Sequence, residues 1–306
     1  MVKISSYSPV GAVSTAFSTN SSSAASRPAP RIASAKSTVS AQSTTSAQGR
    51  IGIEIEESAV AQRFSKAASK YNKLASIQHT IAQQGLNNLP RELSGNALDI
   101  GCGTGMHTQT LSTRGLNAVG VDIADGMLEQ ARNTFPQLVF KNGSAQALPI
   151  SDCSIDIAYS SMALQWVNDP EKVGRELYRV LKPGGIAELA IMVSGSFHEL
   201  KLARKIAQLP QANTPMPSAL QWKQAFQLSK LSVKRLITRD YTDSHKDIMS
   251  LLRSVKGVGA GETGRQQPPL NRQDIKKLSI AYQNTHGVNE VLPLTYRVCH
   301  FRLEKQ

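Results

Sequence analysis

Apolar positions along the chain alternate between helix-like spacing and short continuous runs. Over residues 57–84, Val60, Phe64 and Tyr71 fall on one face of a helix, and this spacing predicts one or two helices there. Runs that predict strands follow at 96–101, 118–123, 138–141, 155–160 and 186–193. Helix-length segments separate most of these runs, so strands and helices are expected to alternate.

Capping residues mark the ends of the intervening helices. We expect the first to end near Arg114 and the second to begin at an Asp125 cap. Asp169 followed by Pro170 predicts the start of the third, which the LKPGG turn at 181–185 is expected to stop. Strands joined by helices imply right-handed crossovers and a parallel sheet covered on both faces, so the predicted fold class is α/β.

Beyond residue 193 the pattern is less regular. We expect two helices and a loop over 194–230, a strand over 231–239, a helix over 248–255 capped near Asp243 or Ser244, a Gly/Pro loop over 257–269, a helix over 272–283 and a closing strand over 294–303. A loop as long as 257–269 inside a domain is usually functional or disordered.

Residues 1–50 differ in composition from the rest of the chain. They hold 19 Ser or Thr, nine Ala, five cations and no acid. Such a segment cannot bury enough apolar surface to offset the entropy lost on ordering. We therefore expect a disordered extension, with an organelle transit peptide as the alternative.

The formal charge of +13 suggests an anionic partner. Removing residues 1–50 leaves +8, and the rest of the chain shows no basic helix stripe and no aromatic-basic interleaving. A nucleic-acid-binding protein without catalysis is therefore a remote alternative. The chain has no run of 18 apolar residues that would predict a membrane-spanning helix.

The cysteines and histidines give no sign of a metal site. Cys102, Cys153 and Cys299 are far apart, and no histidine stands at metal-ligand spacing from them. We expect no metal, a reducing compartment and a cytoplasmic location, or an organelle matrix if residues 1–50 are a transit peptide.

The strongest chemical signal is the segment LDIGCGTG at 98–105. Glycines after a first strand let the backbone turn tightly and approach a ligand at the carboxyl end of the sheet. The spacing of Gly101, Gly103 and Gly105 does not fit the dinucleotide fingerprint, and the lysine of a phosphate-binding loop is absent. With Asp99 beside it, the loop suits a cationic or amine-bearing ligand such as S-adenosylmethionine, which carries no phosphate.

A second acid, Asp122, ends the next predicted strand. Its carboxylate can accept hydrogen bonds from both ribose hydroxyls of a nucleoside cofactor, although a simple strand-end turn is the alternative. The neighbouring Ile123 and Met127 are expected to hold adenine between them, with an ordinary helix-core position as the alternative for Met127.

Several motifs together point to one superfamily. LDIGCGTG, Asp122, ALP at 147–149, the IDIAYS strand and RVLKPGG at 179–185 resemble the class I S-adenosylmethionine-dependent methyltransferases over residues 95–193. The resemblance implies a Rossmann-like, seven-stranded, mostly parallel sheet with an antiparallel last strand, and S-adenosylmethionine as methyl donor. The expected cofactor site comprises Asp99, Gly101, Gly103, Gly105, Asp122, Ile123, Met127, Ser144, Ala145 and Ser160.

One position departs from that pattern. The family usually has Gly-Asp before the ALP segment, and that Asp reaches the adenine amino group. Here the pair is Gly143-Ser144, so a hydroxyl replaces a carboxylate. Either the cofactor binds more weakly or the backbone at Ala145 recognises the adenine.

Blocks outside the cofactor core resemble one subfamily. They are VAQRFSKAASKYNKLASIQ at 60–78, SSMALQWVNDP at 160–170, GSFHEL at 195–200, LLRSVKGVGA at 251–260 and PLTYRV at 293–298. Together they resemble the BioC family, the malonyl-acyl-carrier-protein O-methyltransferases of biotin synthesis. The implied organisation is an extension (1–50) and a methyltransferase domain (51–306), divided into a helical cap (51–94), a cofactor core (95–193), an acceptor-side insertion (194–290) and a closing strand (291–306).

The resemblance also implies residues that serve the acceptor. Tyr71 is expected to touch the methionine moiety or the reacting methyl, and Arg253, Lys256 and Tyr296 are candidates for orienting the malonyl carboxylate. Packing or surface roles are the alternatives for each. Basic residues including Arg253, Lys256 and Arg265 would attract the acidic carrier protein. Gln165 and Trp166 follow a strand after which such enzymes place acceptor contacts.

The expected partner is an acidic acyl carrier protein bearing malonyl-phosphopantetheine, with no nucleic acid, no membrane and a monomeric enzyme. The main alternative is another small-molecule methyltransferase, either a quinone-type C-methylase or an aconitate-type carboxyl O-methylase. Whether a coenzyme A thioester replaces the carrier protein is left open by the sequence.

Overall fold

The computed structural model describes residues 4–6, 56–211, 216–257, 269–287 and 291–306, which all belong to one of the two units into which the chain divides. Apart from a short strand at 4–6, the segment expected to be disordered lies outside these residues. Most of the predicted loop 257–269, including Arg265, lies outside them as well.

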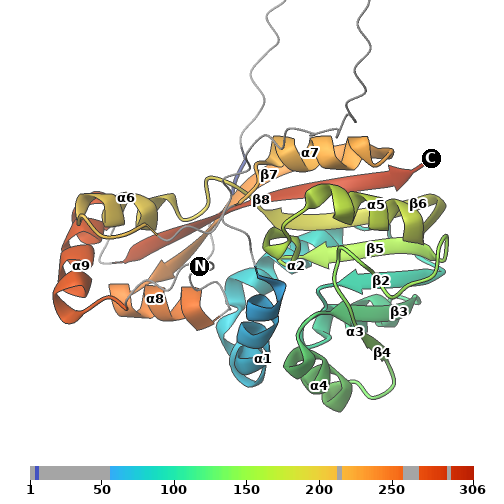
Figure 1. Cartoon of the computed structure of the whole chain (residues 1–306), viewed down its shortest axis with the longest axis horizontal. Helices are drawn as coiled ribbons and strands as arrows, with labels where there is room; N and C mark the ends of the chain where they lie inside the picture. Colours follow the sequence, from blue (N-terminus) through green and yellow to red (C-terminus); the bar gives the residue numbers. More distant parts are fainter. Residues whose placement is uncertain (1–3, 7–55, 212–215, 258–268, 288–290) are drawn as a thin grey trace, which may run out of the picture. The chain divides into compact units, whose positions relative to one another are not determined.

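One mixed sheet runs through this unit in the order β1-β7-β8-β6-β5-β2-β3-β4 (Figure 1). Its strands are β1 (Ile4–Ser6), β2 (Asn96–Ile100), β3 (Asn117–Asp122), β4 (Val139–Asn142), β5 (Ile155–Ser161), β6 (Leu181–Met192), β7 (Leu231–His245) and β8 (Leu292–Lys305). Strands β2 to β6 pair in parallel, whereas β8 is antiparallel to both β6 and β7. The seven strands from β2 to β8 form the predicted class I methyltransferase sheet, and β1 adds an eighth at the outer edge of β7.

The position of β2 in this order determines where a ligand can bind. β2 pairs with β3 on one side and with β5 on the other, because the chain runs outward from β2 through β3 to β4 and then returns to place β5 on the opposite side of β2. In open α/β sheets such a switch point leaves a crevice beyond the carboxyl ends of the strands, and ligands bind there.

Helices cover both faces of the sheet. They are α1 (Glu57–Leu74), α2 (Ser76–Asn88), α3 (Met106–Thr113), α4 (Asp125–Thr134), α5 (Pro170–Val180), α6 (His198–Ile206), α7 (Ala219–Leu228), α8 (Ile248–Gly257) and α9 (Arg272–His286). Leu177 of α5 and Trp222 of α7 pack with Leu98, whereas Leu86 of α2 and Leu111 of α3 belong to a separate cluster with Ala97. Because successive strand residues point to opposite faces, β2 contributes to both cores.

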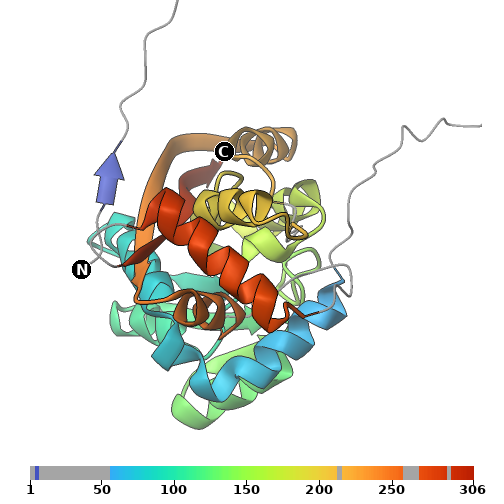
Figure 2. The ribbon, with the colours of Figure 1, turned by 90° about the vertical axis from the view of Figure 1, so that its left-hand side faces the viewer.

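The predicted acceptor-side insertion, 194–290, contains α6, α7, β7, α8 and α9, and three of its helices, α6, α8 and α9, form a group. Figure 2 shows α9 between α6 and α8. Figure 1 places this group beside the carboxyl end of β7 and the amino end of β8. A second apolar core joins them to the sheet through the buried Leu251, Leu278 and Tyr296. None of the helices among the described residues is long and apolar enough to cross a membrane.

Two predicted helix caps are wrong. Asp125 is the first residue of α4 and makes no capping bond, since Ala124 occupies the cap position. Asp243 and Ser244 pair with β8 inside a longer β7, and the Asp247 carboxylate accepts the Ser250 N–H at the start of α8. The prediction that the helix stops at the LKPGG segment is confirmed, because α5 ends at Val180, but the segment is the start of β6 and not a turn before it. The predicted cap at Asp169 is confirmed, because its side chain accepts from the backbone of Glu171 and Lys172.

Candidate active site

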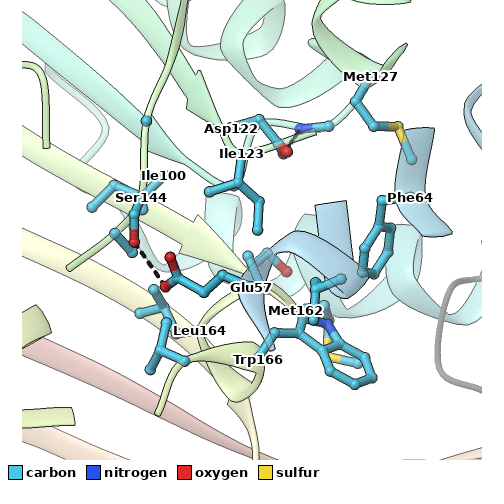
Figure 3. Close-up of a pocket in the computed structure, with 18 of the residues that line it drawn as sticks. Glu57, Phe64, Ile100, Asp122, Ile123, Met127, Ser144, Met162, Leu164 and Trp166 are labelled. Atoms are coloured by element: carbon cyan, nitrogen blue, oxygen red, sulfur yellow. Dashed lines mark hydrogen bonds between the residues drawn. The ribbon is translucent and has the colours of Figure 1, made fainter. Parts of the chain in front are cut away.

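A pocket of about 700 Å³, including the part open to solvent, lies at the carboxyl ends of β2, β3 and β5 (Figure 3). It is lined by Glu57, Val60, Phe64, Tyr71, Ile100, Gly101, Gly103, Asp122, Ile123, Met127, Gly143, Ser144, Ala145, Ser161, Met162, Ala163, Leu164, Trp166 and Val167. The lining is mainly apolar, with a few polar groups from separate elements, which is the usual character of a small-molecule site.

The glycine loop between β2 and α3 forms one wall of the pocket. Gly101, Gly103 and Gly105 have φ of +71°, +53° and +81°, a region that side chains with a Cβ rarely adopt. A Cβ on Gly101 would lie 2.1 Å from the Cβ of Ala163, whereas one on Gly103 would have no atom within 4 Å. Gly103 therefore presents bare backbone to open space in the pocket, and a ligand can approach it closely.

The carboxylate of Asp122 is fixed at the floor of the pocket. Its Oδ2 accepts from the Gly103 N–H at 2.8 Å and its Oδ1 accepts from the Ala124 N–H at 2.8 Å. Burial raises the pKa of Asp122, and its backbone hydrogen bonds oppose that shift. Ile123 and the buried Met127 line the pocket beside it, so the structure brings these three predicted residues together.

Helix α1 covers the pocket with aromatic side chains. The Phe64 ring makes edge contacts with Trp166 and Tyr71, at centroid distances of 5.9 and 6.3 Å. The helix is held against α4 where Ser65 Oγ accepts from the Gly126 N–H at 3.1 Å. A Cβ on Gly126 would lie 2.8 Å from the Ser65 carbonyl oxygen, so this close approach requires glycine.

At the other end of the pocket, Ser144 contacts an acid that the sequence analysis did not single out. Ser144 Oγ donates to Glu57 Oε1 at 2.9 Å, and Gln146 Nε2 donates to the same oxygen at 2.5 Å. Glu57 and Ser144 are 87 positions apart in the sequence. The one sequence signal that could have drawn attention to Glu57 is its place in the first turn of a predicted helix, where the helix dipole favours an acid.

A second cavity of about 410 Å³ adjoins the first along the glycine loop. Its lining residues are Tyr71, Asn72, Gln78, His79, Ala82, Gly101, Cys102, Gly103, Thr104, Met106, His107, Ser161 and Met162. Tyr71 lines both cavities, and burial together with the nearby Asp122 raises its pKa to about 12. Burial and the neighbouring His79 lower the pKa of His107 to about 4, so this imidazole is neutral at physiological pH.

Three predicted cofactor residues do not line either cavity. Asp99 is buried and accepts from Thr108 Oγ1 at 2.7 Å, and burial raises its pKa to about 7. Ser160 donates to the Ile100 carbonyl at 2.8 Å, while its neighbour Ser161 lines both cavities. Gly105 caps α3. Asp99, Ser160 and Gly105 therefore stabilise the glycine loop and the elements beside it without lining the pocket.

Of the predicted acceptor residues, Tyr71 lines both cavities, whereas Arg253, Lys256 and Tyr296 line neither. Arg253 and Lys256 are exposed on α8. Tyr296 is buried in β8 with its ring 4.9 Å from that of Phe197, and burial raises its pKa. Of the two residues after β5, Trp166 lines the first cavity, whereas Gln165 is buried and donates to the Met162 carbonyl. Among the described residues, no three His, Cys, Asp or Glu side chains form a group that could hold a metal ion.

The comparisons with known proteins agree with this geometry. The methyltransferase domain family matches residues 98–189. The malonyl-[acyl-carrier protein] O-methyltransferase of Serratia marcescens is 30% identical over 249 residues, which are 80% of this chain and 95% of that protein. The biotin biosynthesis bifunctional protein BioHC of Cellvibrio japonicus is 32% identical over 256 residues, and the match covers 82% of this chain but only 51% of the bifunctional protein.

A solved structure supports the fold alone. The YcgJ protein of Bacillus subtilis aligns with a TM-score of 0.53 at 17% identity, over 74% of this chain and 98% of that one. The sheet order, the glycine loop and the sequence matches together define the class. The chain belongs to the class I S-adenosylmethionine-dependent methyltransferases.

Proposed function

We propose that this methyltransferase acts on the free carboxylate of a malonyl group carried by an acyl carrier protein and forms its methyl ester. The observation that carries the proposal is the extent of the sequence match. The shared methyltransferase domain covers residues 98–189, whereas the match to the Serratia marcescens protein extends over 249 residues. The similarity therefore includes segments outside the cofactor core, where acceptor specificity resides in this fold.

The chain's own residues fit the cofactor. Asp122 offers a fixed carboxylate to the ribose hydroxyls, and the backbone of Gly101 and Gly103 leaves room for the methionine part. Ile123 and Met127 provide apolar contacts for adenine. When bound, S-adenosylmethionine supplies a methyl group on a positively charged sulfur, which is an activated leaving group.

The reaction needs orientation and exclusion of water more than a base. A carboxylate is already nucleophilic at neutral pH, so in-line displacement depends on proximity and desolvation. Tyr71 lies where the two cavities meet, and its raised pKa keeps the hydroxyl protonated. We assign it the role of donating a hydrogen bond that positions the acceptor carboxylate. The aromatic contacts of Phe64 help to exclude water from this point.

The exposed cations of α8 are better placed to recruit the carrier protein than to take part in catalysis. Arg253 and Lys256 lie on the surface and do not line either cavity, so we propose that they attract the acidic carrier protein. The buried Tyr296 then supports the core that holds α8 in place, next to Phe197. A monomeric enzyme and an extension of 1–50 that takes no part in the reaction stay predictions.

Genetic complementation tests the function in a cell. The chain, expressed in a biotin-requiring bacterial strain that lacks the malonyl-carrier methylation step, should restore growth without biotin. A Gly103→Ala variant, produced at the same level, should restore growth less well. If the unchanged chain is made in folded form and does not rescue growth, the proposed acceptor is wrong.

A further inference from the structure

The pocket contains two carboxylates on opposite sides of one apolar side chain. Figure 3 shows Ile123 between Asp122 and Glu57, with the Glu57 carboxylate directed at Ser144. The two acids come from elements far apart in the sequence, the end of β3 and the first turn of α1. A nucleoside has hydrogen-bond donors at two ends, the ribose hydroxyls and, for adenosine, the exocyclic amine of the base. Two separated acceptors match that arrangement.

Two hydrogen bonds hold the Glu57 carboxylate in place, and both leave its second oxygen without a donor among the described residues. Both hydrogen bonds that the structure gives this carboxylate, from Ser144 and Gln146, end on Oε1. Oε2 therefore accepts none from the described residues. Gln146 is fixed in turn, because its Oε1 accepts from the Asp169 N–H at 3.0 Å at the start of α5. This chain of contacts fixes an acceptor-only group at the pocket wall.

We infer that Glu57 is the residue that selects adenine, because its carboxylate accepts a hydrogen bond from the exocyclic amine of S-adenosylmethionine. Ser144, which stands where a carboxylate would otherwise be expected, serves as a donor that orients Glu57. The acid that recognises the base thus comes from α1, the helix that covers the site. A base carrying a carbonyl oxygen at the same position would place an acceptor against an acceptor and bind poorly.

Binding measurements without any acceptor test this inference, which rests on the use of S-adenosylmethionine and not on the malonyl substrate. The probes are S-adenosylhomocysteine and S-inosylhomocysteine. The first carries an exocyclic amine on its purine ring, and the second carries a carbonyl oxygen at the same position. By calorimetry the wild-type chain should prefer the adenosyl compound by about tenfold or more, as expected for a hydrogen bond to a charged group. In Glu57→Gln the preference should collapse, because an amide both donates and accepts.

The neighbouring Glu56 provides a matched control. It is exposed, and among the described residues its carboxylate accepts a hydrogen bond only from the Ser58 hydroxyl, so Glu56→Gln should keep the wild-type preference. Thermal unfolding without ligand shows whether either variant is folded. An unchanged preference in folded Glu57→Gln would overturn the inference and would leave the proposed acceptor untouched.

A swap of the two side chains supplies a second test. Ser144→Asp alone places two carboxylates next to each other and should weaken binding of S-adenosylhomocysteine. Combined with Glu57→Ala, the new Asp should restore the preference for the adenosyl compound over Glu57→Ala alone. If the double variant is folded and shows no gain, the two positions do not serve the same ligand group and the inference is wrong.

Discussion

The carboxylate of Asp122 accepts a hydrogen bond of 2.8 Å from the backbone N–H of Gly103, which joins the end of β3 to the glycine loop after β2. The two parts of the expected cofactor site are therefore fixed relative to each other by the protein itself. Because Gly103 has φ of +53° and open space where a Cβ would stand, the loop keeps its shape without filling the pocket. Such a preformed site loses little conformational entropy when a ligand binds.

The open space at Gly103 leads to a prediction with an internal control. Gly103→Ala should lower the free energy of unfolding by only about 1–2 kcal/mol, the usual cost of this backbone region for alanine. Binding of S-adenosylmethionine should weaken by about tenfold or more, equivalent to 1.4 kcal/mol, because the new methyl group enters the pocket. Calorimetry and urea unfolding measure the two effects.

Gly184 is the matched control. It has φ of +76° and, like Gly103, no atom within 4 Å of an added Cβ, but it lies in β6 and does not line the pocket. Gly184→Ala should lose a similar amount of stability and keep cofactor affinity. Equal affinity in both alanine variants would show that the ligand does not approach Gly103.

Tyr71→Phe should separate catalysis from cofactor binding. The phenylalanine ring keeps the contact with Phe64, so the affinity for S-adenosylmethionine should change little. Loss of the hydroxyl donor should lower kcat by about ten- to a hundredfold, the range for a hydrogen bond to a charged group. Single-turnover methyl transfer and calorimetry provide both numbers. A fall in cofactor affinity as large as the fall in rate would mean that Tyr71 acts by packing.

The raised pKa of Asp99 predicts that the free energy of unfolding depends on pH. Burial raises the pKa of Asp99 to about 7, above its value in the unfolded chain, although the hydrogen bond from Thr108 opposes the shift. Between about pH 4 and pH 7 the folded chain therefore binds more protons at this residue, and the free energy of unfolding falls as pH rises. The loss is on the order of 1 kcal/mol per pKa unit. The free energy of unfolding of the wild type, measured in urea at several pH values and taken relative to that of Asp99→Asn, should fall across this range, whereas parallel profiles of the two proteins would contradict the assignment.

Charge reversal on α8 tests recruitment of the carrier protein. Lys256→Glu should raise KM for the malonyl carrier protein by about three- to tenfold at low salt and leave kcat and cofactor affinity nearly unchanged, since rim charges act mainly on association. Lys223→Glu on α7, away from α8 in Figure 1, is the control. The difference should shrink as salt is added. An equal effect from both variants would indicate a response to net charge alone.

Site residues that depend on local structure could be predicted from the sequence, whereas those that depend on contacts between distant segments could not. The glycine loop and Asp122 carry local signals, because each follows directly from the end of a strand. The strand end, however, does not reveal which of two successive side chains faces the ligand. Asp99 and Ser160 point behind the loop, while their neighbours Ile100 and Ser161 line the pocket, as the alternation of a strand requires.

Contacts between distant segments left no sequence signal. Glu57 bonds to a residue 87 positions away, and the placement of α8 depends on how the three-helix group packs on β7 and β8. Arg253 and Lys256 could be recognised as part of a matching block, but their distance from the pocket follows only from that packing. The fold itself was predictable because its alternating strands and helices are a local pattern with few allowed topologies.

Intact-protein mass spectrometry of the acceptor tests the central claim most directly. Purified chain, S-adenosylmethionine and malonyl-acyl carrier protein should yield a carrier heavier by one methylene, with the added mass on the malonyl group after its release. Acetyl-acyl carrier protein, which lacks the free carboxylate, should remain unchanged. An unmodified malonyl carrier, together with methylation of a free acid or a quinone by the same preparation, would contradict the proposed function.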